Sequence, residues 1–183
     1  GAPDVAFHIT ANGSMRAALT AIPPSSYSGA ANVAVIMQKL ATQAGLRFEN
    51  AGVTAVLADP YFPGTALQQA QACAAAAGID MVIENGTMVI TRRGAPRAPD
   101  PIVVSANTGM VGYPGYTASG IAVTTIFNPR LTMHSLVETK SVQTPASGRW
   151  RIYSLMHELE AETPKGAWFT SFEASEPQNV PIR

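Results

Sequence analysis

The hydrophobic period of the chain changes near residues 92–101, and this change constrains the fold more than any other feature. Before that segment, apolar residues recur at steps of three and four, as on one face of an α-helix. After it they recur largely at steps of two, as in β-strands. The segment itself, "RRGAPRAPDP", holds three prolines and three arginines in ten residues, which is typical of a linker. We therefore predict an α/β module over residues 1–94, a linker over residues 95–101 and a β-domain over residues 102–183.

Two helices are predicted in the first module. The stretch "ANVAVIMQKLATQAG" places apolar residues on one helix face, and Gly45 can end that helix in a left-handed conformation. A second helix begins after Thr65, which can form a capping box with Gln68, and it ends at Gly78. Its many alanines indicate close packing against a neighbour. The predicted apolar stripes are Val33, Ile36, Met37, Leu40, Ala41 and Ala44 in the first helix, and Leu67, Ala70, Ala74 and Ala77 in the second.

The same module should contain a β-hairpin. In "IDMVIENGTMVITRR" the dipeptide Asn85-Gly86 is the favoured two-residue turn, because both of its positions need a positive φ. Weaker patterns predict a strand over Val5–Thr10, a turn at Asn12-Gly13, and a strand with a turn over Leu46–Val53.

Beyond the linker, short strands alternate with turn clusters such as "GYPGYTASG" and "TPASGR". This spacing favours an antiparallel barrel or sandwich, so the predicted fold class is α+β: two helices and a hairpin, followed by an antiparallel β-barrel. Neither face of the segment that starts at Trp150 is purely polar, which indicates that both faces are covered. The predicted strands are Ile102–Ser105, Gly120–Phe127, Leu136–Val142, Trp150–Glu162 and Trp168–Glu173.

Charge and composition exclude several classes of function. Lys plus Arg and Asp plus Glu number 12 each, and a net charge of zero argues against a nucleic-acid or anionic-membrane binder. Only 13% of residues are charged, which favours association with other subunits. No apolar run approaches the roughly 18 residues of a membrane span. The single cysteine, Cys73, excludes an internal disulfide and a cysteine-cluster metal site, and its Ala-rich surroundings indicate a buried, inert thiol.

Two patterns come near to catalytic chemistry. "HELEA" starts like the helix of a zinc protease, but its fifth position is Ala161 instead of a second histidine, so His157 is interpreted as a hydrogen-bonded structural residue. Glu158, Glu160 and Glu162 alternate on one predicted strand face, and paired carboxylates can hydrolyse glycosides. A solvated or subunit-facing acidic stripe is the simpler interpretation. Trp150 and Trp168 could stack on sugars, although packing is the commoner role at strand starts.

The remaining candidates lack partners. Ser14 and Ser119 have no Gly-x-Ser-x-Gly frame, and His8 and His134 stand alone in strand-like segments. "GMVGYPGY" precedes a strand instead of a helix and has no lysine to grip phosphate, so we interpret it as a rigid loop that presents Tyr113 and Tyr116. The sequence thus predicts no catalytic, cofactor-binding or metal-binding residues, no cofactor and no enzyme activity.

Taken in order, four segments resemble the baseplate hub proteins of Mu-like contractile-tailed phages, which are related to the late control and type VI spike-hub group. The segments are "ANVAVIMQKLATQAGLRFENAGVTAVLADPYFPGT", "AAAAGIDMVIENGTMVI", "TGMVGYPGYTASGIAVTTIFNP" and "GRWRIYSLMHELEAETPKGAWFT". Together they cover most of residues 30–172.

The resemblance implies a trimer in which each subunit supplies two β-barrels and an outer α/β portion. Such a ring joins the sixfold tail tube protein to the threefold central spike protein, resides in the virion, passes through the host cytoplasm during assembly and has no catalytic residues. Residues 102–183 would be the second barrel, and residues 1–94 leave room only for the end of a preceding one, which together with Gly1 in place of Met suggests a piece of a longer protein. The resulting hypothesis is a structural baseplate hub component. The alternative is a cell-wall carbohydrate-binding or hydrolytic module at a tail tip.

Overall fold

The computed structural model describes residues 18–19, 21–142, 144–162 and 164–178. The chain divides into two compact units. The first comprises Gly1–Glu49, Thr54–Ala77 and Ile83–Val89, and the second comprises Asn50–Val53, Gly78–Val82 and Ile90–Arg183. The predicted strand Val5–Thr10, the turn Asn12-Gly13, His8 and Ser14 lie outside the described residues.

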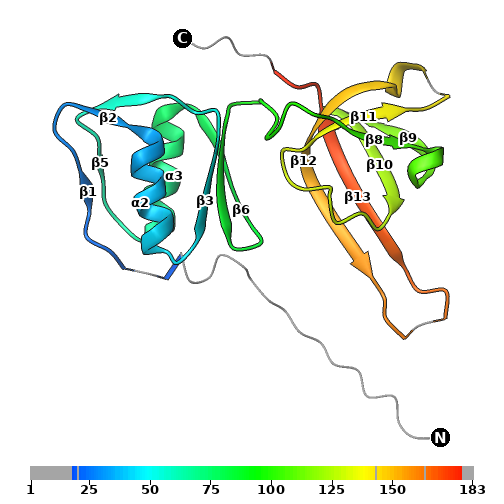
Figure 1. Ribbon diagram of the computed structural model, residues 1–183, viewed down its shortest axis with the longest axis horizontal. Coiled ribbons are helices and arrows are strands. Elements are labelled where there is room, and N and C mark those ends of the chain that lie inside the picture. The colour runs from blue at the N-terminus through cyan, green and yellow to red at the C-terminus, as the bar shows by residue number, and fades with distance from the viewer. Residues whose placement is uncertain (1–17, 20, 143, 163, 179–183) are drawn as a thin grey trace, which may run out of the picture. The chain divides into compact units, whose positions relative to one another are not determined.

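Helix α2, Val33–Gln43, lies at the centre of the first unit and packs against helix α3 (Figure 1). Its N-cap is Asn32, whose Oδ1 accepts the backbone N–H of Ala34 at 2.9 Å and so satisfies one of the unpaired donors of the first turn. Gly45 follows the helix with a φ of +71°, as predicted. All six residues of the predicted stripe are buried, so this helix and its face are confirmed.

Helix α3, Ala66–Ala77, begins with the predicted capping box. The Thr65 N–H donates to Gln68 Oε1 at 2.9 Å, and the Gln68 N–H donates to Thr65 Oγ1 at 3.4 Å. The buried face, however, is shifted from the predicted one and includes Cys73, whose pKa burial raises to about 11. The predicted burial of the thiol is confirmed. The residues of the buried face are Ala66, Gln69, Ala70, Cys73 and Ala74.

Gln69 was not predicted to be buried, yet it is fully enclosed. Its Nε2 donates to the carbonyls of Pro23 at 3.1 Å and Gly64 at 2.8 Å, and its Oε1 accepts the Ser25 N–H at 3.1 Å. A buried amide is tolerated here because these three bonds replace those it would make with water.

Short strands complete the first unit. β1 (Ser25–Ser26) pairs with β5 (Tyr61–Phe62), and β2 (Ala30–Asn32) pairs with β4 (Val56–Ala58). None of the four was predicted, since strands of two or three residues are too short to show a period.

A three-stranded sheet has the order β3-β7-β6, with β3 at Arg47–Ala51, β6 at Ile79–Glu84 and β7 at Thr87–Arg92. The predicted hairpin turn is confirmed, because Asn85 and Gly86 have φ values of +49° and +70°. The tip of the hairpin belongs to the first unit and its base to the second.

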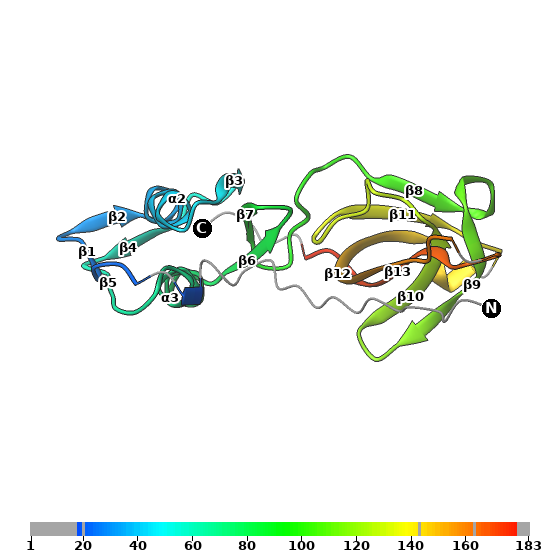
Figure 2. The ribbon, with the colours of Figure 1, turned by 90° about the horizontal axis from the view of Figure 1, so that it is seen from below.

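The second unit is built on a six-stranded sheet of order β8-β11-β12-β13-β10-β9, which curls into half a barrel (Figure 2). Its neighbouring strands are antiparallel except β11 and β8, which are parallel, so the prediction of a wholly antiparallel domain is corrected at this edge. The strands are β8 (Ile102–Ser105), β9 (Met110–Thr117), β10 (Gly120–Ile126), β11 (Leu136–Lys140), β12 (Gly148–Leu159) and β13 (Trp168–Ser175).

The five strands predicted for this unit are present, but a sixth was missed. β9 occupies "MVGYPGYT", which its Gly and Pro residues led us to interpret as a loop. The strand is possible because β9 lies at the edge of the sheet. Pro114 has no backbone N–H, and at an edge no second neighbouring strand requires that donor. A register shift between Ala122 and Thr124 of the adjacent β10 accommodates the irregular segment.

One face of the sheet covers the core of this unit. Leu131 from the loop before β11 and Ala146 from the 3₁₀ turn Thr144–Ala146 complete that core. The remaining buried members come from five of the strands: Val104, Ile121, Val123, Val137, Ile152, Phe172 and Ala174.

Candidate interaction surface

The described residues leave the opposite face of the sheet, which we call the open face, uncovered over β9, β10, β13 and the second half of β12. At Leu136 and Arg151, which lie on the same side of the sheet, it is buried. The β10–β13 register shows the division: Val123 pairs with Phe172 on the core side, while Thr124 pairs with Ser171 on the other. Val123 and Phe172 are buried, and Thr124 and Ser171 are partly exposed. Alternation along each strand therefore separates a packed face from an unpacked one.

The open face is hollowed and carries exposed apolar side chains. A hollow of about 470 Å³ lies over β9, β10, β13 and β12. Of the apolar residues at it, Val111 is 42% exposed, Tyr113 68% and Met156 59%. Ile126, paired with Phe169 on the same side of the sheet, is 55% exposed. Exposed apolar patches on soluble proteins commonly mark sites where another molecule binds.

The electrostatics of the open face favour a protein partner over a charged ligand. Glu173 is the one ionisable carboxylate or base among the residues described as lining the hollow, and the other polar groups there are mostly hydroxyls. Two of these, Thr124 Oγ1 and Ser171 Oγ, already bond each other at 3.1 Å. A weakly charged face with an aromatic and a methionine resembles the centre of a protein–protein interface.

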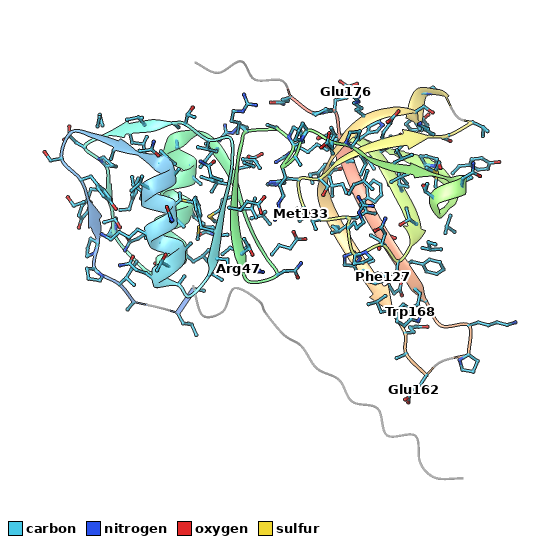
Figure 3. The ribbon with its side chains drawn as sticks, viewed as in Figure 1. Arg47, Phe127, Met133, Glu162, Trp168 and Glu176 are labelled. Carbon is cyan, nitrogen blue, oxygen red and sulfur yellow. The ribbon has the colours of Figure 1, made fainter. Side chains whose placement is uncertain are left out.

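The proposed acidic stripe is not a continuous feature. β12 ends at Leu159, so only Glu158 of the three glutamates lies on the strand, opposite Phe169 on the open face. Glu160 Oε2 accepts the Ala167 N–H at 2.9 Å, and Glu162 has a φ of +61°. Figure 3 shows Glu162 at the tip of the β12–β13 loop. The prediction that all three carboxylates share one strand face is therefore wrong, and the hydrolase alternative loses its support.

His157 has the structural role that was favoured for it. Its Nδ1 lies 2.9 Å from Thr170 Oγ1, and its ring meets Phe127 edge to face at 5.2 Å between centroids. Phe127 in turn contacts Trp168, whose Nε1 donates to the Glu160 carbonyl at 2.9 Å (Figure 3). Within the described residues, no group of three or more His, Cys, Asp or Glu side chains could hold a metal ion.

The two tryptophans differ in environment. Trp150 is partly buried against the core and donates from Nε1 to the Ala146 carbonyl at 3.3 Å, whereas Trp168 is 50% exposed. Tyr113 and Tyr116, expected in a loop, both lie on β9. Tyr113 is at the hollow, and Tyr116 is opposite Ile121, a residue of the core side. Ser119 lies in the exposed turn between β9 and β10.

Sequence reasoning missed a buried polar network in the second unit. Arg151 donates from Nη2 to Asp80 Oδ2 at 2.7 Å and from Nε to the Ala95 carbonyl at 2.8 Å. Thr91 Oγ1 lies 3.5 Å from Arg151 Nη2 and 3.4 Å from Nδ1 of His134. No local pattern could have revealed this network, because its members are up to 71 residues apart.

His134 does not lie in a strand-like segment, as we had expected, but in a turn with a φ of +65°. Burial, together with the positive charge of Arg151, lowers its pKa to about 4, although the Asp80 carboxylate acts in the opposite direction. Burial likewise lowers the pKa of Arg151, opposed by Asp80. The network therefore holds β6, which carries Asp80, and β12, which carries Arg151, together within the second unit.

The linker segment lies at the wall of a second hollow. This hollow, of about 570 Å³, is lined by Arg92 and Arg97 together with Arg149 of β12 and several Ala and Pro residues. Ala95 is buried, and the Arg97 N–H donates to the His134 carbonyl at 2.8 Å. The predicted linker is therefore packed against the second unit at these two positions.

No helix in the described part of the chain has the length and apolar character needed to cross a bilayer.

Comparisons with known proteins agree with the resemblance seen in the sequence. A family model described as baseplate hub gp41 matches residues 1–168. Comparison with curated proteins gives no match. The crystal structure of the prophage MuSo2 43 kDa tail protein from Shewanella oneidensis is similar, with a TM-score of 0.57 and 10% sequence identity. That match covers 83% of this chain and 64% of the other, so the chain spans less than two thirds of that protein, and at this identity the likeness concerns the fold. The predicted resemblance to phage baseplate hubs is confirmed, and the chain belongs to the baseplate hub gp41 family.

Proposed function

We propose that this chain is part of a baseplate hub subunit that assembles as a trimeric ring and joins the tail tube protein to the central spike protein. Membership of the hub family gives it a structural role in the phage baseplate. In the ring, the protein resides in the virion, and it passes through the host cytoplasm during assembly.

The observation that carries the proposal is the open face. Where the sheet buries only one of its faces, Val111, Tyr113, Ile126 and Met156 are left in water, which is unfavourable by about 25 cal/mol for each Å² of apolar surface. Covering the face with another copy of the chain removes that surface from water. The low charge of the chain, 13% of residues, limits the electrostatic cost of such contacts.

Light scattering coupled to size-exclusion chromatography tests the proposal on the full-length protein. The wild type should have the mass of a trimer. Tyr113→Asp, which places a charge at the hollow, should raise the dissociation constant of the trimer at least about tenfold, since aromatic residues at interface centres carry much of the binding free energy.

Tyr61→Asp is the matched control, because Tyr61 is a strand tyrosine of similar exposure, 60%, on β5. It should leave the trimer unchanged. A wild type that is monomeric at every concentration, or a Tyr113→Asp variant that assembles like the wild type, contradicts the proposal.

A further inference from the structure

Among the described residues, β8 is one edge of the six-stranded sheet and pairs only with β11. Along the other side of an edge strand, backbone N–H and C=O groups point outward and can pair with a strand of another molecule. The sequence of β8, "IVVS", offers no obstacle to such pairing, because it contains neither a proline nor a charge, and Val103 is 37% exposed. The edge is therefore a pairing surface unless something occupies it.

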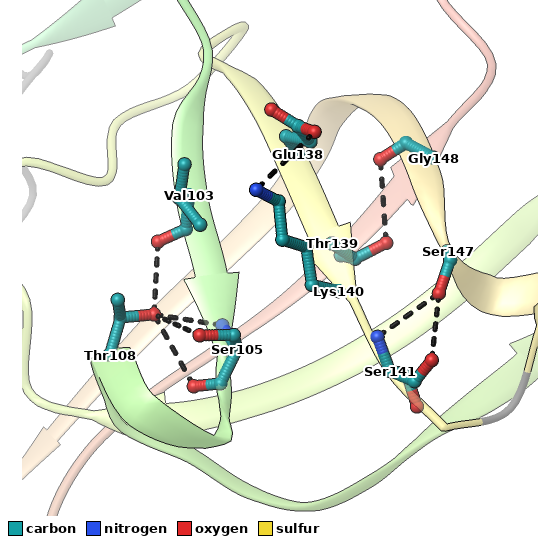
Figure 4. A network of polar contacts seen from close by, with 9 residues as sticks. All are labelled: Val103, Ser105, Thr108, Glu138, Thr139, Lys140, Ser141, Ser147 and Gly148. Carbon is teal, nitrogen blue, oxygen red and sulfur yellow. Dashed lines mark hydrogen bonds and ion pairs between the residues drawn. The ribbon is translucent and has the colours of Figure 1, made fainter.

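The side chain of Thr108 occupies it. Thr108 Oγ1 accepts the backbone N–H of Ser105 at 2.8 Å and donates to the carbonyl of Val103 at 3.1 Å (Figure 4). The same oxygen lies 3.3 Å from the Ser105 carbonyl and 3.2 Å from Ser105 Oγ. Residues 103 and 105 are two apart in a strand, so their backbone groups point to the same side, away from β11. One hydroxyl thus replaces the donor and the acceptor that a neighbouring strand would supply.

The fold holds Thr108 in this position. The 3₁₀ turn Ala106–Thr108 reverses the chain directly after β8, and Gly109 follows with a φ of +103°. The Gly109 carbonyl accepts the Ile126 N–H at 2.8 Å, which ties the turn to β10. A side chain on Gly109 would overlap that of Ile126, so the close approach requires glycine.

The other sheet edge is protected differently. β9 carries Pro114, which lacks an N–H, and a register shift in its pairing with β10 bends the strand. β8 has neither device, so among the described residues its protection rests on the Thr108 turn and on its short length of four residues.

We propose that the outer edge of β8 is a strand-pairing surface for the β8 edge of a second copy of this chain, which presents the same uncharged, proline-free strand, and that the Thr108 hydroxyl keeps it closed. By closing the β8 edge, the Thr108 hydroxyl restricts contacts between copies of the chain to surfaces other than this edge. It is independent of the trimer proposed above, because it concerns an edge of the sheet and not its open face.

Thr108→Val tests the proposal, since valine keeps the shape of threonine and removes the hydroxyl. Size-exclusion chromatography with light scattering should show a mass at least twice that of the wild-type assembly, growing with protein concentration. At low concentration, amide exchange of Ser105 should become at least tenfold faster. Thr108→Ser, which retains the hydroxyl, should behave as the wild type. A Thr108→Val variant with the mass and Ser105 exchange of the wild type overturns the proposal.

A second variant separates edge pairing from association of unfolded chains. Val103→Pro removes the outward N–H of β8, which sheet pairing with β11 does not use. Added to Thr108→Val, it should return the mass to that of the wild type, with the near-ultraviolet circular dichroism of the tryptophans retained. If the double variant still forms the larger species, association does not run through the β8 edge and the proposal is wrong.

Discussion

At the scale of single residues, stability in the second unit depends on a few enclosed polar groups. Arg151 is held by Asp80 and the Ala95 carbonyl, and His134 is enclosed beside them. A buried histidine next to a guanidinium stays neutral, because charging it costs desolvation and repulsion. These interactions join segments that are distant in sequence, which is why the sequence alone gave His134 no partner.

The buried imidazole makes stability depend on pH. His134 binds a proton near pH 6.5 in the unfolded chain but only near pH 4 in the folded one. The unfolded state therefore binds more protons between these values, so the free energy of unfolding should fall as pH drops from 6.5 to 4, by up to about 3 kcal/mol. His134→Asn, which tolerates the left-handed backbone, should remove this part of the pH dependence in urea unfolding at pH 7, 5.5 and 4. His157→Asn is the control: it retains His134, so its free energy of unfolding should fall with pH as much as that of the wild type. If the free energy of His134→Asn falls by the same amount, the pH dependence does not come from His134.

At the scale of elements, a helix or strand could be predicted when the residues that cause it to form lie close together in the sequence. The two helices and the hairpin were predicted because their signals, such as the Thr65–Gln68 capping box and the Asn85-Gly86 turn, lie within a few residues. β9 was missed because its existence depends on β10 beside it and on its place at an edge. The open face was only partly predictable. Arg151 and Ile152 are consecutive on β12 and lie on opposite faces, yet both are buried, because Asp80 and Ala95 from earlier in the chain contact Arg151. The register shift that follows, between Ile152 and Ser154, moves the alternation of β12 by one residue.

The start of β10 depends on a glycine that approaches another strand. Gly120 has a φ of +150°, and a Cβ there would overlap the carbonyl oxygen of Ala174 in β13. Gly120→Ala should lower the free energy of unfolding by about 3 kcal/mol, because the backbone of β10 or β13 must shift. Gly115→Ala in the paired strand β9 is the control, since the nearest atom to its Cβ would be the Ala122 carbonyl oxygen at 4.0 Å. In urea unfolding, the free energy of unfolding of Gly115→Ala should lie within about 0.5 kcal/mol of the wild-type value. If Gly115→Ala and Gly120→Ala are destabilised equally, the close approach of Gly120 to β13 is not the cause.

At the scale of the whole molecule, composition and contacts suggest different boundaries. The proline-rich segment places a boundary at residues 95–101, which stays a prediction. The compact units instead assign Asn50–Val53 and Gly78–Val82 to the same body as the six-stranded sheet. Asp80 and Ala95, the two closest partners of Arg151, both precede residue 102. A β-domain cut at that residue would lack them.

The effect of Arg151→Leu should therefore depend on the length of the chain. In the whole chain, where the side chain of Arg151 is 7% exposed, the substitution removes the ion-pair partner of Asp80, which keeps the Gly94 N–H as a donor, and the side-chain donor to the Ala95 carbonyl. It should cost about 3 kcal/mol. In a piece limited to residues 102–183 those partners are missing, so the same change should cost less than about 0.5 kcal/mol or even stabilise. Arg149 is an exposed residue of the same strand, so Arg149→Leu should hardly change the free energy of unfolding of the whole chain or of the shorter piece. Trp150 and Trp168 are present in both proteins, so tryptophan fluorescence in urea gives all the free energies. An equal cost of Arg151→Leu in the two would mean that residues 102–183 form a self-sufficient domain, and that the boundary inferred from composition is the physical one.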